Sequence, residues 1–170
     1  GCIIGGVYKG FYDLFKLGWI EKIPKIYAVQ SNGSSAIVNA LSTGTLSAVN
    51  ASTIADSISV DLPRDGLKAI RAVTESNGTG IKVSDIEILN AQHTLAKTTG
   101  VFAEPAAATG FAGLEKSSIK GLISSNESAV VLVTGTGLKD IHSAQQLVQI
   151  PDAINPNIDS FKKNWRKIGG

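Results

Sequence analysis

The sequence has one cysteine, no methionine and no long apolar run, and each of these features excludes a class of protein. A single cysteine, Cys2, cannot form a disulfide within the chain. No stretch approaches the roughly 18 to 20 consecutive apolar residues that a membrane-spanning helix needs. The 16 basic and 14 acidic residues leave a net charge of +2, so the charge indicates no nucleic-acid surface. We therefore expect a cytoplasmic globular protein that binds neither membranes nor nucleic acid.

The absence of methionine also bears on how much of the protein this sequence represents. Without it, the chain does not begin at an initiator residue in the form given. Gly1 lies within a glycine-rich segment, whereas domain boundaries usually fall in polar linkers. We interpret the 170 residues as the carboxyl-terminal part of a longer protein, long enough to bury one sizeable core. The alternative is a trimmed chain that folds by itself.

Apolar periodicity predicts strands that alternate with helices along the chain. The predicted strands are 26–30, 80–83 and 129–133, with 53–60 extended, and the predicted helices are 6–21, 34–41, 64–74, 84–99, 104–114 and 143–148. Such alternation is typical of an α/β fold with a mainly parallel sheet flanked by helices. Residues 1–150 are predicted to form the carboxyl-terminal portion of a large domain, and residues 151–170 a carboxyl-terminal extension of unknown role.

The first six residues, Gly1-Cys2-Ile3-Ile4-Gly5-Gly6, precede the first predicted helix and are interpreted as a glycine-rich loop. Backbone N–H groups converge where such a loop opens a helix, and the helix dipole favours an anion there. The segment matches neither G-x-G-x-x-G nor the G-K-[ST] ending of a P-loop. A phosphate site and a simple tight turn are therefore equal alternatives.

A second candidate site follows the apolar run Val130–Val133, which ends at Thr134 and then at Gly135 and Gly137. This pattern predicts a buried strand that delivers a hydroxyl group to a ligand, with glycines that permit its close approach. The alternative is that Thr134 only caps the strand. Glu104 begins another predicted helix. A carboxylate at this position interacts favourably with the helix dipole, which explains the residue without a role in ligand binding.

The remaining reactive side chains form no recognisable catalytic or metal-binding set. His93 and His142 have no second ligand at metal spacing, so both are expected to be structural or solvent-exposed. Cys2 has no histidine paired with it in the sequence. We therefore predict no metal site.

Several segments together resemble threonine synthases, in the same order along the chain. They are Thr53–Val60 with Pro63–Ile70, Gly100–Ala108 and Leu132–Asp140. Threonine synthases are fold type II pyridoxal-phosphate enzymes of the tryptophan-synthase β group. The resemblance runs from Gly1 to about Asp140, with none evident past Pro151. It implies that the chain is the carboxyl-terminal portion of the large cofactor-binding domain.

The resemblance also implies roles for individual residues. Gly1, Cys2 and Ile3 would offer backbone N–H groups to the cofactor phosphate, Thr134 would face the pyridine nitrogen, and Glu104 would lie near the ring. In this family the lysine that holds the cofactor lies in the amino-terminal half. No residue of this chain is therefore assigned a catalytic role, and the chain alone is expected to be inactive.

The implied reaction converts O-phosphohomoserine and water to threonine and phosphate. The implied partners are this phosphorylated amino acid, the amino-terminal half of the enzyme and a second copy in a homodimer. Two differences from the family's motifs bear on the identity of the substrate more than on that of the cofactor. Thr136 stands where a histidine is common in the family, and the first loop reads Cys-Ile-Ile.

Two other readings stay open. Threonine and serine dehydratases share the fold, but their strand-end motif usually reads Ser-Gly-Gly-Asn, and Thr134-Gly135-Thr136-Gly137 argues against them. From another class, the chain could be a non-catalytic, stand-alone α/β half-domain that binds a phosphorylated metabolite or a partner chain.

Overall fold

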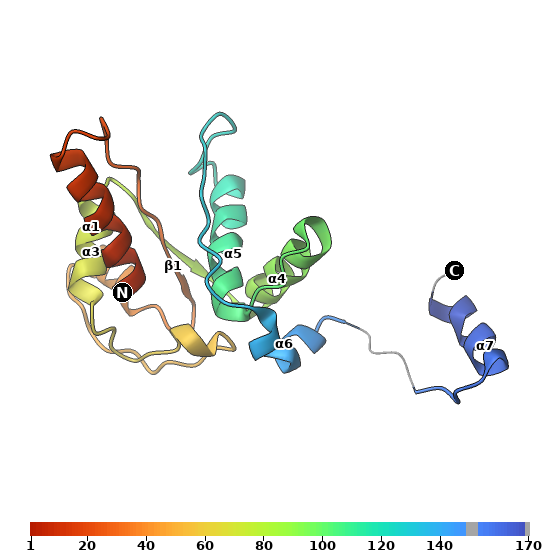
Figure 1. Cartoon of the computed structure of the whole chain (residues 1–170). Helices are drawn as coiled ribbons and strands as arrows, with labels where there is room; N and C mark the ends of the chain where they lie inside the picture. Colours follow the sequence, from red (N-terminus) through yellow and green to blue (C-terminus); the bar gives the residue numbers. More distant parts are fainter. Residues whose placement is uncertain (149–152, 169–170) are drawn as a thin grey trace.

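A computed structural model describes residues 1–148 and 153–168 (Figure 1). Its helices are α1 (Cys2–Lys16), α2 (Ala36–Thr43), α3 (Gly66–Glu75), α4 (Asp85–Thr99), α5 (Pro105–Ile119), α6 (Ile141–Gln145) and α7 (Ile158–Ile168). The strands are β1 (Ala28–Ser31) and β2 (Gly80–Val83), and two 3-10 turns are η1 (Asp56–Ile58) and η2 (Gly137–Lys139).

The two strands form a parallel pair. Ala28 lies opposite Gly80, and Ser31 lies opposite Val83. The connection between β1 and β2 contains α2 and α3, because parallel strands need a crossover of this kind. The predicted α/β fold with a parallel sheet is confirmed, and the strand predicted at 80–83 coincides with β2.

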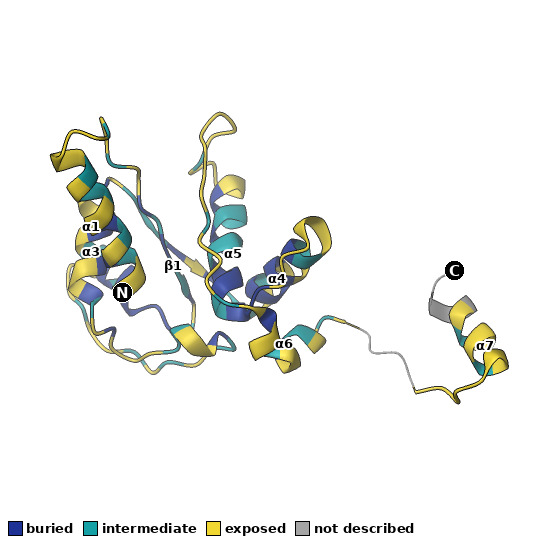
Figure 2. Cartoon of the chain, viewed as in Figure 1, coloured by how far each residue is buried: buried dark blue, intermediate teal, exposed yellow. Residues whose placement is uncertain are grey.

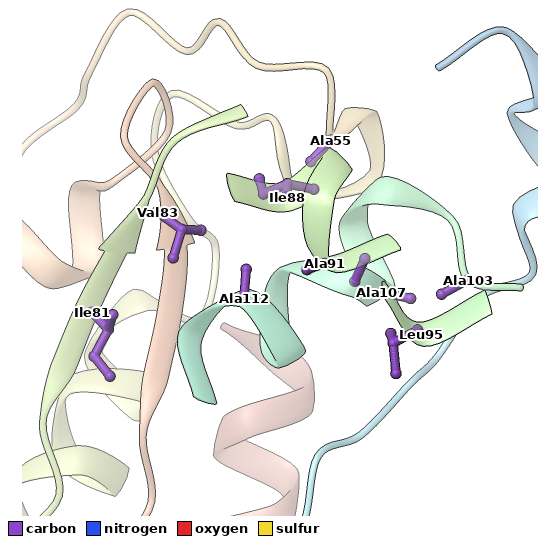
Figure 3. Packing of buried hydrophobic residues seen from close by; sticks show 10 residues of the cluster. Ala55, Ile81, Val83, Ile88, Ala91, Leu95, Ala103, Ala107 and Ala112 are labelled. Atoms are coloured by element: carbon purple, nitrogen blue, oxygen red, sulfur yellow. The ribbon is translucent and has the colours of Figure 1, made fainter. Parts of the chain in front are cut away.

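Helices α1 and α3 lie on one side of the strands and α4 and α5 on the other, and buried residues are found in β1 and in parts of these helices (Figure 2). On one face, Ile37 of α2 and Val73 of α3 pack with Ala28 of β1. On the other face, Ile81 of β2 packs in a cluster with Ile88 of α4 and the alanines of α5 (Figure 3). Removal of this apolar surface from water is the main stabilising contribution to the fold.

Helix α5 lies close to the sheet because its inward side chains are small. Ala107, Ala108 and Ala112 are buried. A Cβ atom added to Gly113 would lie 2.3 Å from Cγ2 of Val29, so only glycine fits there without movement. The sequence predicts that this helix ends at Leu114, whereas α5 continues to Ile119.

The predicted glycine loop at the start of the chain is wrong, because helix α1 already begins at Cys2. Gly5 is buried, and a Cβ atom there would lie 3.1 Å from Cβ of Lys68. The glycine therefore serves close packing of α1 against α3 rather than loop freedom. The helix ends at Lys16, and Gly18 just beyond it has a φ of +72°, a conformation that glycine adopts easily.

The predicted buried strand at 129–133 is also wrong. This segment has no regular secondary structure, and Val130 is 88% exposed. β-branched residues favour strands, but a strand also needs a neighbour to share its hydrogen bonds. Within residues 1–148 and 153–168, no strand pairs with this segment. The extended segment predicted at 53–60 likewise contains η1 rather than a continuous strand.

A capping box begins α4. The Ser84 hydroxyl accepts a hydrogen bond from the Glu87 N–H at 3.3 Å, and the Glu87 carboxylate accepts one from the Ser84 N–H at 2.6 Å. Beyond α6, residues 149–152 lie outside the described part of the chain. Among the residues that are described, no helix is both long and apolar enough to cross a membrane.

Candidate functional site

Ligands of parallel α/β sheets bind outside the carboxyl ends of the strands, and here that region is organised by Asp85. Its carboxylate accepts hydrogen bonds from the Ser31 hydroxyl at 3.2 Å, the Thr53 hydroxyl at 2.5 Å and the Ile54 N–H at 3.1 Å. Ser31 ends β1, and Asp85 begins α4 directly after β2. Asp85 therefore joins both strand ends to the loop that begins at Thr53. This role of Asp85 was not predicted, because its donors Ser31 and Thr53 lie 54 and 32 residues away along the chain.

The turn that follows β1 makes further hydrogen bonds to the same loop. The Ser34 hydroxyl accepts a hydrogen bond from the Val60 N–H at 3.1 Å and donates to the Ile58 carbonyl at 3.0 Å. A Cβ atom on Gly33 would lie 1.7 Å from the Ser52 carbonyl oxygen. The two loops therefore pack backbone against backbone, which fixes the position of η1.

An open pocket of about 250 Å³ lies beside η1. It is lined by Asp56, Ser57, Glu104, Pro105, Ala106, Lys139 and Asp140. Glu104 is only 8% exposed, and one of its carboxylate oxygens lies 3.7 Å from Nζ of the exposed Lys139. Lys139 partly balances the charge that Glu104 brings to the pocket.

The structure brings the predicted residue Glu104 next to the glycine loop that follows Thr134. The Glu104 N–H donates to the Gly135 carbonyl at 3.0 Å, and Ala103 forms an antiparallel bridge with Thr136. A Cβ atom on Gly135 would lie 2.1 Å from a carboxylate oxygen of Glu104. Gly135 is therefore required for the close approach of Glu104, while Thr134 itself is exposed.

Gly1, Cys2 and Ile3 occupy the first positions of α1. The first backbone hydrogen bond of the helix runs from the Gly5 N–H to the Gly1 carbonyl at 3.0 Å. The N–H groups of Cys2 and Ile3 consequently have no acceptor within the helix. Both residues are exposed, and these donors lie at the positive end of the helix dipole.

Charged side chains near the two parts of the site are paired. The Cys2 thiol and the Lys68 ammonium hold the pKa of Asp65 below its ordinary value, and Lys68 lies 2.8 Å from Asp65. Hydrogen bonds from Ser143 hold the pKa of Asp140 below its ordinary value. The carboxylates of Asp65 and Asp140 therefore stay ionised near neutral pH.

The predicted site residues fall into two groups, one at the start of α1 and one around Glu104 and Thr134. In the view of Figure 1, the chain's amino end lies toward the same end of the molecule as α6. Within residues 1–148 and 153–168, no hydrogen bond or ion pair joins α1 to residues 102–140. His93 and His142 are exposed, as predicted. The described residues contain no group of three or more histidine, cysteine, aspartate or glutamate side chains able to hold a metal ion.

Comparisons with solved structures support the fold. An L-serine ammonia-lyase from Rhizomucor miehei superposes with a TM-score of 0.63 at 22% identity, over 80% of this chain and 44% of that chain. Maize serine racemase gives a TM-score of 0.55 at 18% identity, over 85% of this chain and 39% of that chain. At these identities the likeness concerns the fold alone, and it confirms the predicted fold type II architecture.

Comparisons of sequence give relatives of higher identity. Threonine synthase of Methanosarcina acetivorans is 36% identical over 163 residues, which cover 94% of this chain and 40% of that protein. The Methanocaldococcus jannaschii threonine synthase is 34% identical over 168 residues, covering 97% of this chain and 42% of that protein. The chain thus spans about two fifths of the length of these curated relatives. Since so little of the chain stays unaligned, the expectation of no similarity past Pro151 is wrong.

A family model described as "Pyridoxal-phosphate dependent enzyme" matches residues 1–135. This range includes α1, both strands and the segment that ends at Gly135. Both groups of predicted site residues therefore lie within the match. The chain belongs to the family of pyridoxal-phosphate-dependent enzymes.

Proposed function

We propose that this chain is the carboxyl-terminal part of a threonine-synthase-like lyase, which converts O-phosphohomoserine and water to threonine and phosphate. The observation that carries the proposal is the 36% identity with Methanosarcina acetivorans threonine synthase across 94% of the chain. The chain spans 40% of that relative, so an amino-terminal portion would supply the rest of the enzyme.

The donor groups of this chain suit pyridoxal phosphate. Exposed N–H groups at the start of a 15-residue helix suit a phosphate, because unpaired donors and the helix dipole act together there. The exposed Thr134 hydroxyl has no hydrogen-bond partner within the described residues and could bind a ring nitrogen. Bound pyridoxal phosphate would supply the electron sink for elimination and replacement at an amino acid.

In this proposal the chain's own residues bind and orient the cofactor. Gly1, Cys2 and Ile3 hold the phosphate through their backbone. Thr134 would donate one hydrogen bond to the pyridine nitrogen, and a neutral hydroxyl there leaves that nitrogen largely unprotonated. Glu104, fixed by its burial and by Gly135, lies near the ring.

The partners follow from the same proposal. The substrate is a phosphorylated amino acid, the amino-terminal portion carries the lysine that holds the cofactor, and two assembled enzymes form a homodimer in the cytoplasm. The chain without that portion is inactive. The sequence Thr134-Gly135-Thr136-Gly137 favours a synthase over a dehydratase, and the likeness to an ammonia-lyase concerns the fold only.

Phosphate release from O-phosphohomoserine tests the proposal. The assay compares this chain alone, the amino-terminal portion of Methanosarcina acetivorans threonine synthase alone, and both together with pyridoxal phosphate. We expect phosphate and threonine only from the mixture. Thr134→Val should lower kcat by at least about tenfold, which corresponds to about 1.4 kcal/mol of lost transition-state stabilisation. Thr98→Val, at an exposed position of α4 away from the site, is the control and should change kcat little.

The other readings give different outcomes in the same assay. Release of ammonia from serine or threonine, without phosphate release from O-phosphohomoserine, would indicate a dehydratase. Phosphate binding with no turnover in any mixture would indicate a non-catalytic binding domain.

A further inference from the structure

A buried amide side chain joins α4 to the segment that precedes α5. Gln92 of α4 is 3% exposed, and its Nε2 donates a hydrogen bond to the Ala103 carbonyl at 2.7 Å. The neighbours of Gln92 on the helix, Ala91 and Leu95, belong to the apolar cluster that also contains Ala103 (Figure 3). A polar group in such surroundings costs free energy unless it is hydrogen-bonded. The loss of the Gln92 donor would therefore leave a buried carbonyl unpaired.

The Ala103 carbonyl depends on Gln92 because of its position in the backbone pairing. Ala103 and Thr136 form the antiparallel bridge, and the two hydrogen bonds of this bridge come from the flanking residues: Glu104 N–H to the Gly135 carbonyl at 3.0 Å, and Gly137 N–H to the Phe102 carbonyl at 2.9 Å. The paired residues themselves exchange no hydrogen bond in this arrangement. Within the described residues, no backbone N–H donates to the Ala103 carbonyl. Gln92 supplies the hydrogen bond that the bridge leaves out.

The same helix also holds the other segment that lines the pocket. Asp85, seven residues before Gln92, accepts hydrogen bonds from the loop that leads into η1, and η1 and Glu104 both line the pocket. Seven residues are about two helical turns, so the two polar side chains lie on one face of α4, about 10 Å apart along its axis. Helix α4 is therefore a common frame for both segments.

We propose that Gln92 is a positioning residue of the cofactor site, which sets the places of Glu104 and Thr134 through the Ala103 carbonyl. This inference rests on the proposed function, in which both groups lie against the cofactor ring. Glu104 directly follows Ala103, and the bridge transmits the position of Ala103 to the segment that begins at Thr134. Gln92 itself does not line the pocket, so it acts only through the backbone.

A small displacement is enough for this role to matter. A misplacement of about 1 Å by a substitution remote from the chemistry can lower a rate by about a hundredfold. The Glu104 carboxylate has little room to adapt, because a Cβ atom on Gly135 would lie 2.1 Å from one of its oxygens. A shift of Ala103 would therefore move Glu104 and the loop at Gly135 together.

Amide hydrogen exchange on the full 170-residue chain tests the connection without cofactor or substrate. Gln92→Met keeps the length of the side chain and removes its N–H donor. The Glu104 and Gly137 amides, which form the bridge, should exchange at least about tenfold faster in this variant. The Ala28 amide, which donates to the Thr79 carbonyl at 2.9 Å next to the sheet, should exchange as in the wild-type chain.

Ser76→Ala is the matched control, because it also removes a buried bond from a side chain to the backbone. The Ser76 hydroxyl, on a residue 5% exposed, accepts a hydrogen bond from the Ile26 N–H at 2.9 Å and donates to the Val73 carbonyl at 3.2 Å. This control should leave the exchange rate of the Glu104 amide unchanged relative to that of Ala28. The comparison separates a local effect on the bridge from a general loss of stability.

The assembled enzyme gives a second readout. The chain is combined with the amino-terminal portion of Methanosarcina acetivorans threonine synthase, and the probes are pyridoxal phosphate and O-phosphohomoserine. Gln92→Met should weaken pyridoxal phosphate binding, measured by absorbance, and should lower kcat at saturating cofactor by at least about tenfold. KM for O-phosphohomoserine should change by less than about twofold, because the groups that Gln92 positions are assigned to the cofactor rather than to the substrate. Ser76→Ala should change none of these values.

The proposal is overturned if the Glu104 and Gly137 amides of Gln92→Met exchange at the wild-type rate. It is also overturned if all amides accelerate equally, or if the bridge loosens while kcat and cofactor binding stay at their wild-type values. A wild-type mixture that binds pyridoxal phosphate but releases no phosphate would contradict only the proposed reaction, since the exchange rates and the cofactor affinity still decide the role of Gln92.

Discussion

Replacement of Asp85 by alanine tests how the candidate site is held together. Its carboxylate accepts three hydrogen bonds, from the Ser31 hydroxyl, the Thr53 hydroxyl and the Ile54 N–H. Ser31 is 1% exposed, so water has little access to its hydroxyl after the substitution. At about 1 kcal/mol for each lost hydrogen bond, Asp85→Ala should lower the free energy of unfolding by about 3 kcal/mol.

Urea unfolding followed by circular dichroism measures this loss. With an m-value of about 2 kcal/mol/M, the midpoint should fall by about 1.5 M. Asp61→Ala is the matched control, because the exposed Asp61 side chain accepts one hydrogen bond, from the Ala51 N–H at 2.8 Å. The control should lose about 1 kcal/mol or less. An Asp85→Ala loss no larger than that of the control would refute the assignment of Asp85 as the residue that joins the strand ends to the loop.

Three further substitutions probe packing and pH dependence. Gly113→Ala places a methyl group 2.3 Å from Val29 and should destabilise the chain by about 1 to 3 kcal/mol. Gly10→Ala, where a Cβ atom would have nothing within 4 Å, should stabilise α1 by about 0.5 to 1 kcal/mol. Melting temperatures of the two variants that shift in the same direction would contradict this. The Tyr8 hydroxyl donates to Glu75 and lowers the pKa of that carboxyl below its ordinary 4.5, so the stabilisation is present above pH 4.5 and is lost as pH falls through the folded-state pKa. Tyr8→Phe should therefore flatten the acid side of a plot of melting temperature against pH, and an unchanged acid slope would count against the role of this hydrogen bond.

Local signals in the sequence were sufficient to predict much of the secondary structure and the fold class. The capping box at Ser84 depends on residues three apart, and the helix ends at Gly18 and Gly100 depend on a backbone conformation that glycine adopts easily. The alternation of apolar runs with helical periodicity gave the α/β class and the position of β2. All of these depend on neighbours within a few residues along the chain.

The sequence by itself determined the capping box at Ser84, the strand at 80–83, the α/β class and the family resemblance. Only the tertiary structure decided three other features. Gly5 lies within α1 and allows α3 to pack closely against it. Residues 129–133 have no strand beside them in the described structure, and Asp85 accepts hydrogen bonds from β1 and from the loop at Thr53. Each feature depends on residues far apart in the sequence, and neither composition nor periodicity records which distant groups meet.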